Sequence, residues 1–465
     1  MIQVLRLENS FISRSNNLDL TEESQKYHSS SGGRGILVSL YEFVSLYWPN
    51  IRTVIICADE DKLFMTDCLN IISGSFPTIK SLVIKDAGNI TGLHLWISKK
   101  HPKLSKLELI NTHDSRLSFV QLFDTSDESS EVKKSRGTMG LEHLVAEKVS
   151  LTDAVFEKLA LNGRIRSLVI NESNFESNFK NPSEVKDETP LTPSLYVPRS
   201  VPNRLISLKF CQIVPVDLEY RFPMNSLMLP KIEEFVLECD IFPHDGHFFD
   251  YFFKEKHLNL KKIILPTIND SLALDISENC PNLTLLTVVA NGGHCYENLD
   301  FSNSGLNSLF SNLPFLTNIE ISTKCFTSRK PFSVNDGLFN YYNNSEWKLS
   351  SLTKISILDA YFSPQSISTL ISLSPSLRIL KVSLKNNKIQ LPSPPSDEFT
   401  TSATNPLSLL ALCCSTNSSF ERLANISPYS SSFEKLVVYY RNIKSKYAQR
   451  LENIPNLHLR RISFC

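Results

Sequence analysis

The chain has 465 residues, of which 42% are hydrophobic and 21% charged, and 48 basic residues balance 48 acidic ones. These fractions are typical of globular proteins and exclude a chain that is disordered or fibrous throughout. A net charge of zero provides no bulk field to attract nucleic acid or an anionic membrane, so we expect neither as a partner. Glycine, at 14 residues, is too scarce for a fold built on glycine-rich phosphate loops.

The N-terminal segment and the cysteines indicate the compartment. Met1 to Leu20 has no uninterrupted apolar stretch, so we expect no signal peptide, and no stretch has the length that spans a bilayer. The ten cysteines are scattered without metal-ligand spacing. In a reducing compartment such cysteines behave as small buried hydrophobes. We therefore expect a cytoplasmic or nuclear protein.

A short apolar pattern recurs along the chain. It first appears in the predicted strand Ile2–Leu7, and two of its copies, Pro77–Ile84 and Pro102–Leu109, share the form Pro-x-apolar-x-x-apolar-x-apolar. Other copies, with or without the proline, begin at Pro49, Leu141, Ile165, Leu205, Pro230, Leu260, Pro281, Pro314, Leu352, Pro375, Phe433 and Leu459. Most neighbouring copies lie 23 to 28 residues apart. Repetition at this period is typical of stacked-repeat proteins.

Helices are predicted between the copies. Residues 36–47 carry apolar side chains at three- and four-residue steps, Ser150 with Asp153 has the pattern of a capping box, and Ser363-Pro364 begins a further helix. Each proline lacks an N–H group and disfavours the helical conformation in the residue before it, so the helix ends where the strand begins. A strand and a helix cannot bury their apolar sides alone, and stacking such units forms a solenoid.

The Leu-x-x-Leu-x-Leu core, with one helix in each unit of roughly 25–28 residues, resembles the leucine-rich repeats of the ribonuclease-inhibitor-like type. The irregular repeat lengths and the Pro-x-Leu lead-in resemble the repeat region of F-box proteins with leucine-rich repeats, although no F-box is detectable. The resemblance implies an α/β fold: one horseshoe-shaped solenoid over residues 1–465, with a parallel concave sheet and outer helices. The asparagine that usually follows each strand in the family fits at Asn111 and Asn171 but not at Lys85.

Polar segments rich in Ser, Thr, Pro and Asn interrupt the repeats and are predicted to be loops or disordered inserts. They comprise residues 9–35, 124–137, 176–203, 386–406 and 415–432. Ser126, Ser129 and Ser130 lie among carboxylates and are candidates for phosphorylation, and the alternative interpretation is a tolerated surface insertion.

Side chains alternate along a strand, so the central residue of each copy should face the concave surface. We predict that the following residues bind a partner protein: Ile55, Val83, Glu108, Val145, Val169, Lys209, Val236 and Ile264. The same position in other copies is held by Arg6, Thr287, Glu320, Ser356, Lys381, Val437 and Ser463. An apolar stripe on an open surface favours a protein-binding groove, although β-branched residues also suit strands for their own sake. Since these positions should face solvent, we expect lysine at Val83, Val169 and Val236 to preserve the fold.

Motifs for catalysis are not found. The densest candidate is His244 to Asp250, where His-x-x-His could bind zinc, but Asp-Gly between the histidines favours a turn followed by an aromatic helix face. Gly32 to Gly35 lacks the Lys-Ser/Thr of a phosphate-binding loop, and no nucleophile motif occurs. The basic cluster Arg441 to Arg450 is interpreted as a solvated face. We predict no enzymatic activity, no metal and no cofactor.

The sequence thus predicts a protein that binds other proteins through its concave sheet. By resemblance, its implied role is substrate recognition in a cullin-type ubiquitin ligase, with the ligase adaptor and the cullin as further partners. Two alternatives remain open. One is a stand-alone scaffold, and the other is a small-GTPase regulator similar to the Ran GTPase-activating proteins, for which no motif is found.

Overall fold

The computed structural model describes residues 4–8, 50–58, 62–76, 78–87, 93–101, 103–112, 140–161, 164–175, 203–215, 222, 224, 226–239, 247–249, 252–290, 301–323, 334–342, 346–362, 364–384, 409–414, 435–440 and 457–461. Outside these ranges lie the predicted helix 36–47, the basic cluster 441–450 and the predicted inserts, apart from Asn203. The chain divides into two compact units, Met1–Asp217 (unit 1) and Leu218–Cys465 (unit 2). The single array predicted over residues 1–465 stays a prediction.

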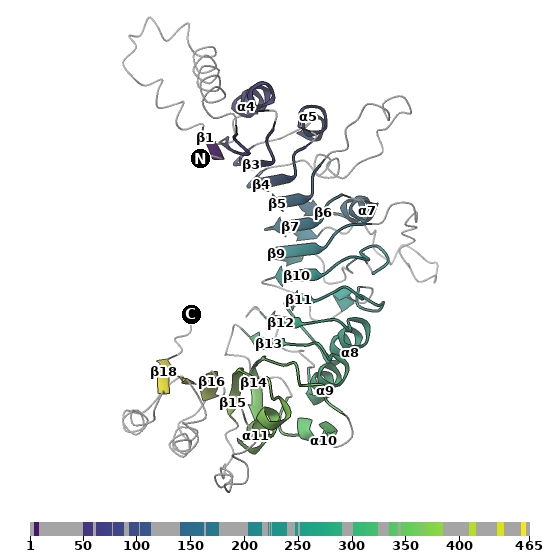
Figure 1. Cartoon of the computed structure of the whole chain (residues 1–465), viewed down its shortest axis with the longest axis vertical. Helices are drawn as coiled ribbons and strands as arrows, with labels where there is room; N and C mark the ends of the chain where they lie inside the picture. The colour runs from purple at the N-terminus through teal and green to yellow at the C-terminus, as the bar shows by residue number, and fades with distance from the viewer. Residues whose placement is uncertain are drawn as a thin grey trace, which may run out of the picture. The chain divides into compact units, whose positions relative to one another are not determined.

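Unit 1 contains a parallel sheet whose strands pair in chain order. The strands are β1 (Val4–Glu8), β2 (Thr53–Cys57), β3 (Ser81–Lys85), β4 (Lys106–Ile110), β5 (His143–Glu147), β7 (Ser167–Asn171) and β9 (Ser207–Pro215). Helices α4 (Lys62–Ser75), α5 (Leu93–Lys100) and α7 (Asp153–Leu161) lie on one side of these strands (Figure 1). The short strands β6 (Ser150–Leu151) and β8 (Asn174–Phe175) form a second small sheet with the end of β9. Ser150 therefore lies in a strand, and the capping box predicted from it is wrong.

Unit 2 repeats the arrangement. Its strands, again parallel and paired in chain order, are β10 (Glu234–Cys239), β11 (Lys262–Leu265), β12 (Leu285–Ala290), β13 (Asn318–Thr323), β14 (Lys354–Phe362), β15 (Ile379–Leu384), β16 (Leu409–Cys414), β17 (Leu436–Tyr440) and β18 (Leu457–Arg461). Its helices are the 3-10 helix His247–Phe249, α8 (Asp270–Asn279), α9 (Asn303–Asn312), α10 (Leu338–Tyr342) and α11 (Pro364–Leu373). The α/β solenoid with a parallel sheet is thus confirmed in each unit.

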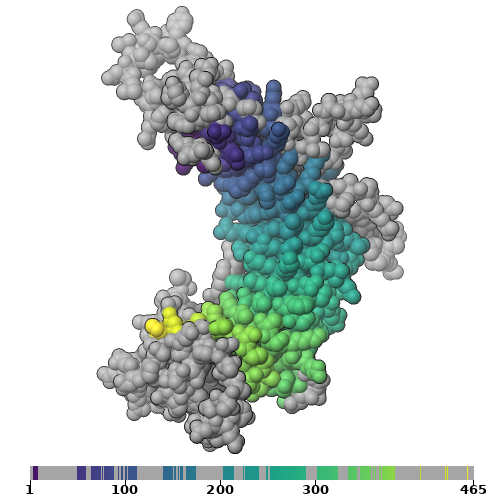
Figure 2. Space-filling view, viewed as in Figure 1, coloured from purple at the N-terminus to yellow at the C-terminus, as the bar shows by residue number. Residues whose placement is uncertain are grey.

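The α-helices of the described ranges are short, from 5 residues in α10 to 14 in α4. Helix α8 packs against α9, and α9 against α10. On the face shown in Figure 2, the coloured repeats of unit 2 that precede β16 pack against one another without a gap. In the part of the chain that the structure describes, no helix has the length and apolar character needed to cross a membrane.

The repeated apolar pattern has a direct structural meaning. In the copy at Pro77, Ile79 precedes β3, Leu82 and Ile84 alternate along it, and all three are buried. The equivalent residues of the next copy, Leu104, Leu107 and Leu109, are buried in the same way. Each repeat therefore contributes one apolar residue from the turn and two from the strand to a core that continues through the unit.

A fourth buried position lies three residues before the first apolar residue of the copy, and we call it the corner residue. At Cys280 the backbone N–H donates to the Ile276 carbonyl at 2.9 Å, which ends α8, and the Cys280 carbonyl accepts from the Leu283 N–H at 3.0 Å. The corner residue thus closes one helix and positions the next strand. The buried residues at this position are Phe76, His101, Leu229, His257, Cys280, Leu313, Leu349 and Ser374.

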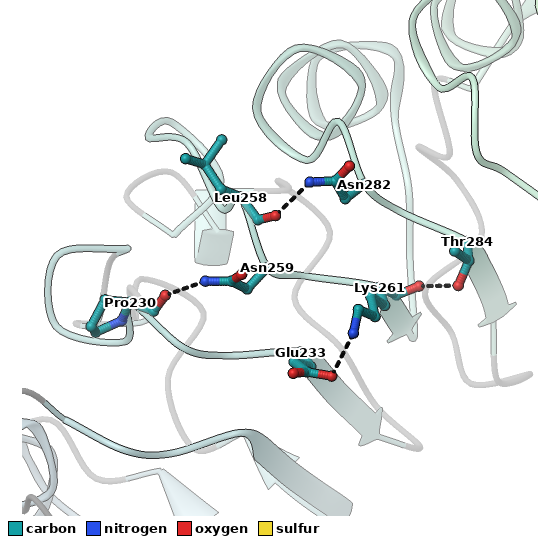
Figure 3. Close-up of polar contacts among 7 residues, drawn as sticks. All are labelled: Pro230, Glu233, Leu258, Asn259, Lys261, Asn282 and Thr284. Atoms are coloured by element: carbon teal, nitrogen blue, oxygen red, sulfur yellow. Dashed lines mark hydrogen bonds and ion pairs between the residues drawn. The ribbon is translucent and has the colours of Figure 1, made fainter.

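Polar contacts join the repeats along the turns that lead into the strands (Figure 3). The Lys261 carbonyl accepts hydrogen bonds from the N–H of Thr284 at 2.9 Å and of Leu285 at 3.0 Å, and the Thr284 hydroxyl donates to it as well. The side-chain amide of Asn259 donates to the Pro230 carbonyl at 2.8 Å, and that of Asn282 to the Leu258 carbonyl at 2.7 Å. These bonds satisfy backbone groups at the strand entrance and fix the stagger between repeats.

Two features near the C-terminal end differ from the prediction. Strand β16 was not predicted, although Leu407, Leu410 and Leu412 follow the apolar pattern, with Pro406 one position later than the pattern requires. The last strand was predicted to begin its copy at Leu459, with Ser463 in the central position. In the structure His458 lies opposite Val437, five residues before Ser463, so the Ser463 assignment is wrong. The copy starts at Ile454, and Pro455 lies inside it.

Candidate binding surface

The open face of the unit 1 sheet carries the side chains that alternate with the core residues of each strand. The register places one residue of every strand in a single row across this face, which we call the central row. It consists of Arg6, Ile55, Val83, Glu108, Val145, Val169 and Lys209. The residues predicted to bind a partner in unit 1 are therefore neighbours in space. In unit 2, Val236 and Ile264 are neighbours in the corresponding row.

The central row is unevenly exposed. Ile55, Val145 and Val169 are partly exposed, whereas Val83 is 7% and Val236 3% exposed. Val83 lies in register between Ile55 and Glu108, and these larger side chains flank the short valine. The expectation that lysine at Val83 and Val236 faces solvent is therefore wrong, because either substitution places a charge in a buried position. Val145 and Val169 are the better positions for probing the surface.

Charges on this face are mostly paired within the chain. Lys106 Nζ lies 2.5 Å from Glu108 Oε1 in the same strand, and Arg6 Nη2 lies 2.6 Å from Glu8 Oε1. Exposed pairs of this kind contribute little to stability, but they reduce the field that the face presents to a partner. Lys85, at the end of β3, has no ion pair among the described residues.

The chain leaves the open face of unit 1 through residues in the left-handed conformation, which we call the rim. They are Asp86 (φ 51°), Asn111 (φ 50°), Lys148 (φ 57°), Glu172 (φ 47°) and Gln212 (φ 55°). The residue after each of them returns to the interior, as the buried Ala87, Val149 and Ile213 show. None is glycine, so the usual signal for this conformation was absent from the sequence. The signal that could have found them is a polar residue two positions after the last core residue of the strand.

Side chains of the rim bond across neighbouring repeats. The Asn111 amide donates to Asp86 Oδ1 at 2.7 Å, and Lys148 Nζ donates to Asn111 Oδ1. The backbone N–H of Asn111 donates to Glu147 Oε2 at 3.1 Å. Asn111, predicted as one of the family-type asparagines, therefore bridges two repeats, whereas Asn171 is the last residue of β7.

The open face of unit 2 is polar at the central position of β12 to β15. Thr287, Glu320, Ser356 and Lys381 are register neighbours on β12 to β15. Lys354 forms an ion pair with Glu320, and Lys262 Nζ lies 2.8 Å from Glu234 Oε1. Ser356 is fully buried and its hydroxyl has no partner in the described part of the chain. This face is less suited than that of unit 1 to an apolar contact.

The segment considered for zinc belongs to an aromatic core. Phe248 and Phe249 lie in the 3-10 helix, and they, Phe252 and Phe253 are each at most 1% exposed, so the predicted aromatic helix face is an interior cluster. The rings of Phe235 and Phe252 lie 4.5 Å apart. His244, Asp245 and Asp250 lie outside the described residues. Among the residues that are described, no three His, Cys, Asp or Glu side chains lie together as metal ligands would.

Two corner residues are buried histidines. His101 is 1% exposed and packs against Trp96 with the ring centroids 4.5 Å apart and the rings tilted by 41°. Neither ring nitrogen of His101 has a partner among the described residues. Burial, together with the nearby Lys100 charge, lowers the pKa of His101 from 6.5 to about 4. His257 is 2% exposed, and one ring nitrogen lies 2.6 Å from the Phe252 carbonyl oxygen. Burial lowers its pKa, and the Phe252 carbonyl and Glu255 oppose that effect.

Comparison with known proteins identifies no relative: no protein-family model matches the chain, and no curated protein matches it.

Proposed function

We propose that the chain is a non-enzymatic protein of the leucine-rich-repeat type that binds a partner protein through the open face of unit 1. The observation that supports this most directly is the register that aligns Ile55, Val145 and Val169, all partly exposed, in one row. Neighbouring strands lie about 4.8 Å apart, so the row from Ile55 to Val169 is a strip across five strands, in which Glu108 is the one charged residue. A mainly apolar strip whose one carboxylate is paired with Lys106 has the composition of an interface core.

The rigidity of the sheet supports the same role. The carbonyl before each strand accepts two N–H groups from the next repeat, as at Lys80 with Ser105 and Lys106, both at 2.9 Å. The side chains of the central row therefore need little reorganisation when a partner binds, which lowers the entropic cost of association.

By resemblance of the repeat pattern, we propose that the partner is the substrate of a cullin-type ubiquitin ligase in the cytoplasm or nucleus. In this role the repeats hold the substrate, and a separate helical module binds the ligase adaptor. A stand-alone scaffold would use the same surface but would not associate with an adaptor.

The proposal is tested by affinity purification of the native protein from its own cells, with quantitative mass spectrometry of the recovered proteins. The wild type is compared with a double variant, Val145→Lys and Val169→Lys, and with a control, Asn70→Lys and Thr78→Lys. Asn70 and Thr78 are exposed on α4 and on the turn before β3, so the control adds the same charge away from the open face.

We expect the substrate to be lost from the double variant only, and the adaptor and cullin to be recovered with all three proteins. Partners that bind the double variant as well as the wild type would overturn the open face as the binding surface. Recovery of face-dependent partners without adaptor or cullin would overturn the ligase role and leave a scaffold.

A further inference from the structure

We propose that the segment bound by the open face of unit 1 is apolar and presents one carboxylate side chain to Lys85. This inference rests on the proposed function and specifies the chemistry of its partner. Two observations support it: the neighbours of Lys85 are apolar, and other charged residues on the face are paired within the chain.

Lys85 stands on the open face at the end of β3, two residues after Val83. Its register neighbours are Cys57 on β2 and Ile110 on β4. Cys57 is 8% and Val83 7% exposed, and Ile110 is partly exposed. Lys85 thus has apolar neighbours and lies on the same face as the strip that runs from Ile55 to Val169.

Four acidic groups on the open face and rim of unit 1 are engaged with other residues. Asp86 follows it, but Asp86 Oδ1 accepts the Asn111 amide at 2.7 Å. Glu108 is paired with Lys106 at 2.5 Å, and Glu147 accepts the Asn111 N–H at 3.1 Å. Glu8 is paired with Arg6 at 2.6 Å. Among the described residues, the ammonium of Lys85 is therefore left without an ion pair.

A partner that covers the strip also removes water from around Lys85. Burying an ammonium without a partner is strongly unfavourable, so a wholly apolar segment would be penalised at this point. A carboxylate placed against the ammonium removes that penalty, and the apolar neighbours strengthen the pair by excluding water. Arg6, Glu8, Lys106 and Glu108 do not require complementary groups, because each has an ion-pair partner within the chain.

The test uses linear peptides selected from a random phage-displayed library against the whole immobilised protein. Selected peptides are synthesised, and their affinities are measured by fluorescence anisotropy for the wild type, Val145→Lys, Lys85→Gln, Lys85→Glu and the control Lys103→Gln. Lys103 is an exposed lysine of the turn before β4, so the control removes the same charge outside the open face. Melting curves verify that each variant is folded.

We expect the peptides to be apolar with a shared acidic residue, to lose binding to Val145→Lys, and to bind Lys85→Gln roughly tenfold more weakly, a difference of about 1.4 kcal/mol. Lys85→Glu should weaken binding further, and Lys103→Gln should have no effect. If binding depends on Val145 but is unchanged by Lys85→Gln, the carboxylate proposal is overturned and the proposed function stands. If no selected peptide depends on Val145, the proposed function is overturned as well.

Discussion

The carboxylate of Asp270, at the start of α8, lies against Gly305 in the first turn of α9: Asp270 Oδ1 accepts the Gly305 N–H at 3.1 Å. The same oxygen accepts the Ser302 N–H at 2.7 Å, and Oδ2 receives the Ser302 hydroxyl at 2.5 Å. One side chain of a repeat therefore caps the helix of the next repeat, where backbone donors have no partner within the helix. A β-carbon at Gly305 would lie 2.5 Å from Asp270 Oδ1 and 2.8 Å from the Phe301 ring.

This contact predicts that Gly305→Ala lowers the free energy of unfolding by about 1–3 kcal/mol, because the added methyl group overpacks the site. In an open helix position the same substitution would stabilise by about 1 kcal/mol. Gly74 in α4 is the control, since a β-carbon there meets nothing within 4 Å. Urea denaturation of both variants checks the prediction. Equal effects of Gly305→Ala and Gly74→Ala would show that Asp270 moves aside without cost.

The buried His101 predicts a specific pH dependence. Its folded-state pKa of about 4 lies below its ordinary value of 6.5, so the unfolded chain takes up a proton first as the pH falls. The contribution of neutral His101 to stability is complete above pH 6.5 and decreases as the pH falls from 6.5 towards 4. His101→Phe should remove this loss, because Phe76 fills the same corner position one repeat earlier.

Thermal unfolding between pH 7 and pH 4.5 checks the prediction. The difference in melting temperature between His101→Phe and the wild type should grow as the pH falls, while carboxylates titrate equally in both proteins. The converse variant, Phe76→His, should become more sensitive to acid. A constant difference across this range would contradict the assignment of His101 as a buried neutral base.

The strands and their alignment could be predicted from the spacing of the apolar residues. Strand positions, their parallel order and the alignment of residues such as Val145 and Val169 follow from three apolar residues per copy, since only one register buries all of them. Strand β16 was missed because its copy at Leu407 lies between polar segments and Pro406 stands one position later than in the other copies. The corner position was missed because its residues, among them Phe76, His101 and Cys280, share burial but not chemical type.

Exposure was harder to predict than register. Alternation assigns Val83 and Val145 to the same face, but whether a side chain there reaches solvent depends on the size of its four neighbours, which lie on three different strands. The rim could not be predicted from glycine, and its bonds join residues 25 and 37 positions apart. Lys85 is left without an ion pair because acidic groups of the open face and rim make such contacts, and these contacts cannot be predicted from the spacing of residues along the chain.

Asn203 connects the end of the predicted insert 176–203 to the fold. It is 3% exposed, and its amide donates to the carbonyls of Leu159 at 2.8 Å and Ala160 at 3.2 Å, in the last turn of α7. Its Oδ1 accepts the Leu205 N–H at 2.8 Å. Asn203→Ala should cost about 2–3 kcal/mol, because buried backbone groups lose their partners. Urea denaturation checks this, with the exposed Asn70→Ala expected to change stability by less than about 0.5 kcal/mol. Similar effects at both positions would contradict the capping role.

The left-handed conformation of the rim predicts that, at Glu172, a glycine variant is more stable than an alanine variant, the reverse of the usual order. A residue with φ 47° holds its β-carbon close to the backbone, which costs about 1–2 kcal/mol for any residue except glycine. Glu172→Gly and Glu172→Ala both remove the exposed carboxylate and differ only in that carbon. Glu172→Gly should therefore be the more stable variant by about 1 kcal/mol, despite the greater freedom of glycine in the unfolded chain.

The same pair of substitutions at Arg204 provides the control, because Arg204 is exposed and its φ is not positive. There alanine should be the more stable variant, since glycine only adds entropy to the unfolded chain. The denaturant midpoints of the four variants, measured together, check the predicted order of stability at Glu172 and at Arg204. If alanine is at least as stable as glycine at Glu172, the rim residue is not held in the left-handed conformation, and the turn that returns Ser173 to the core must be formed in another way.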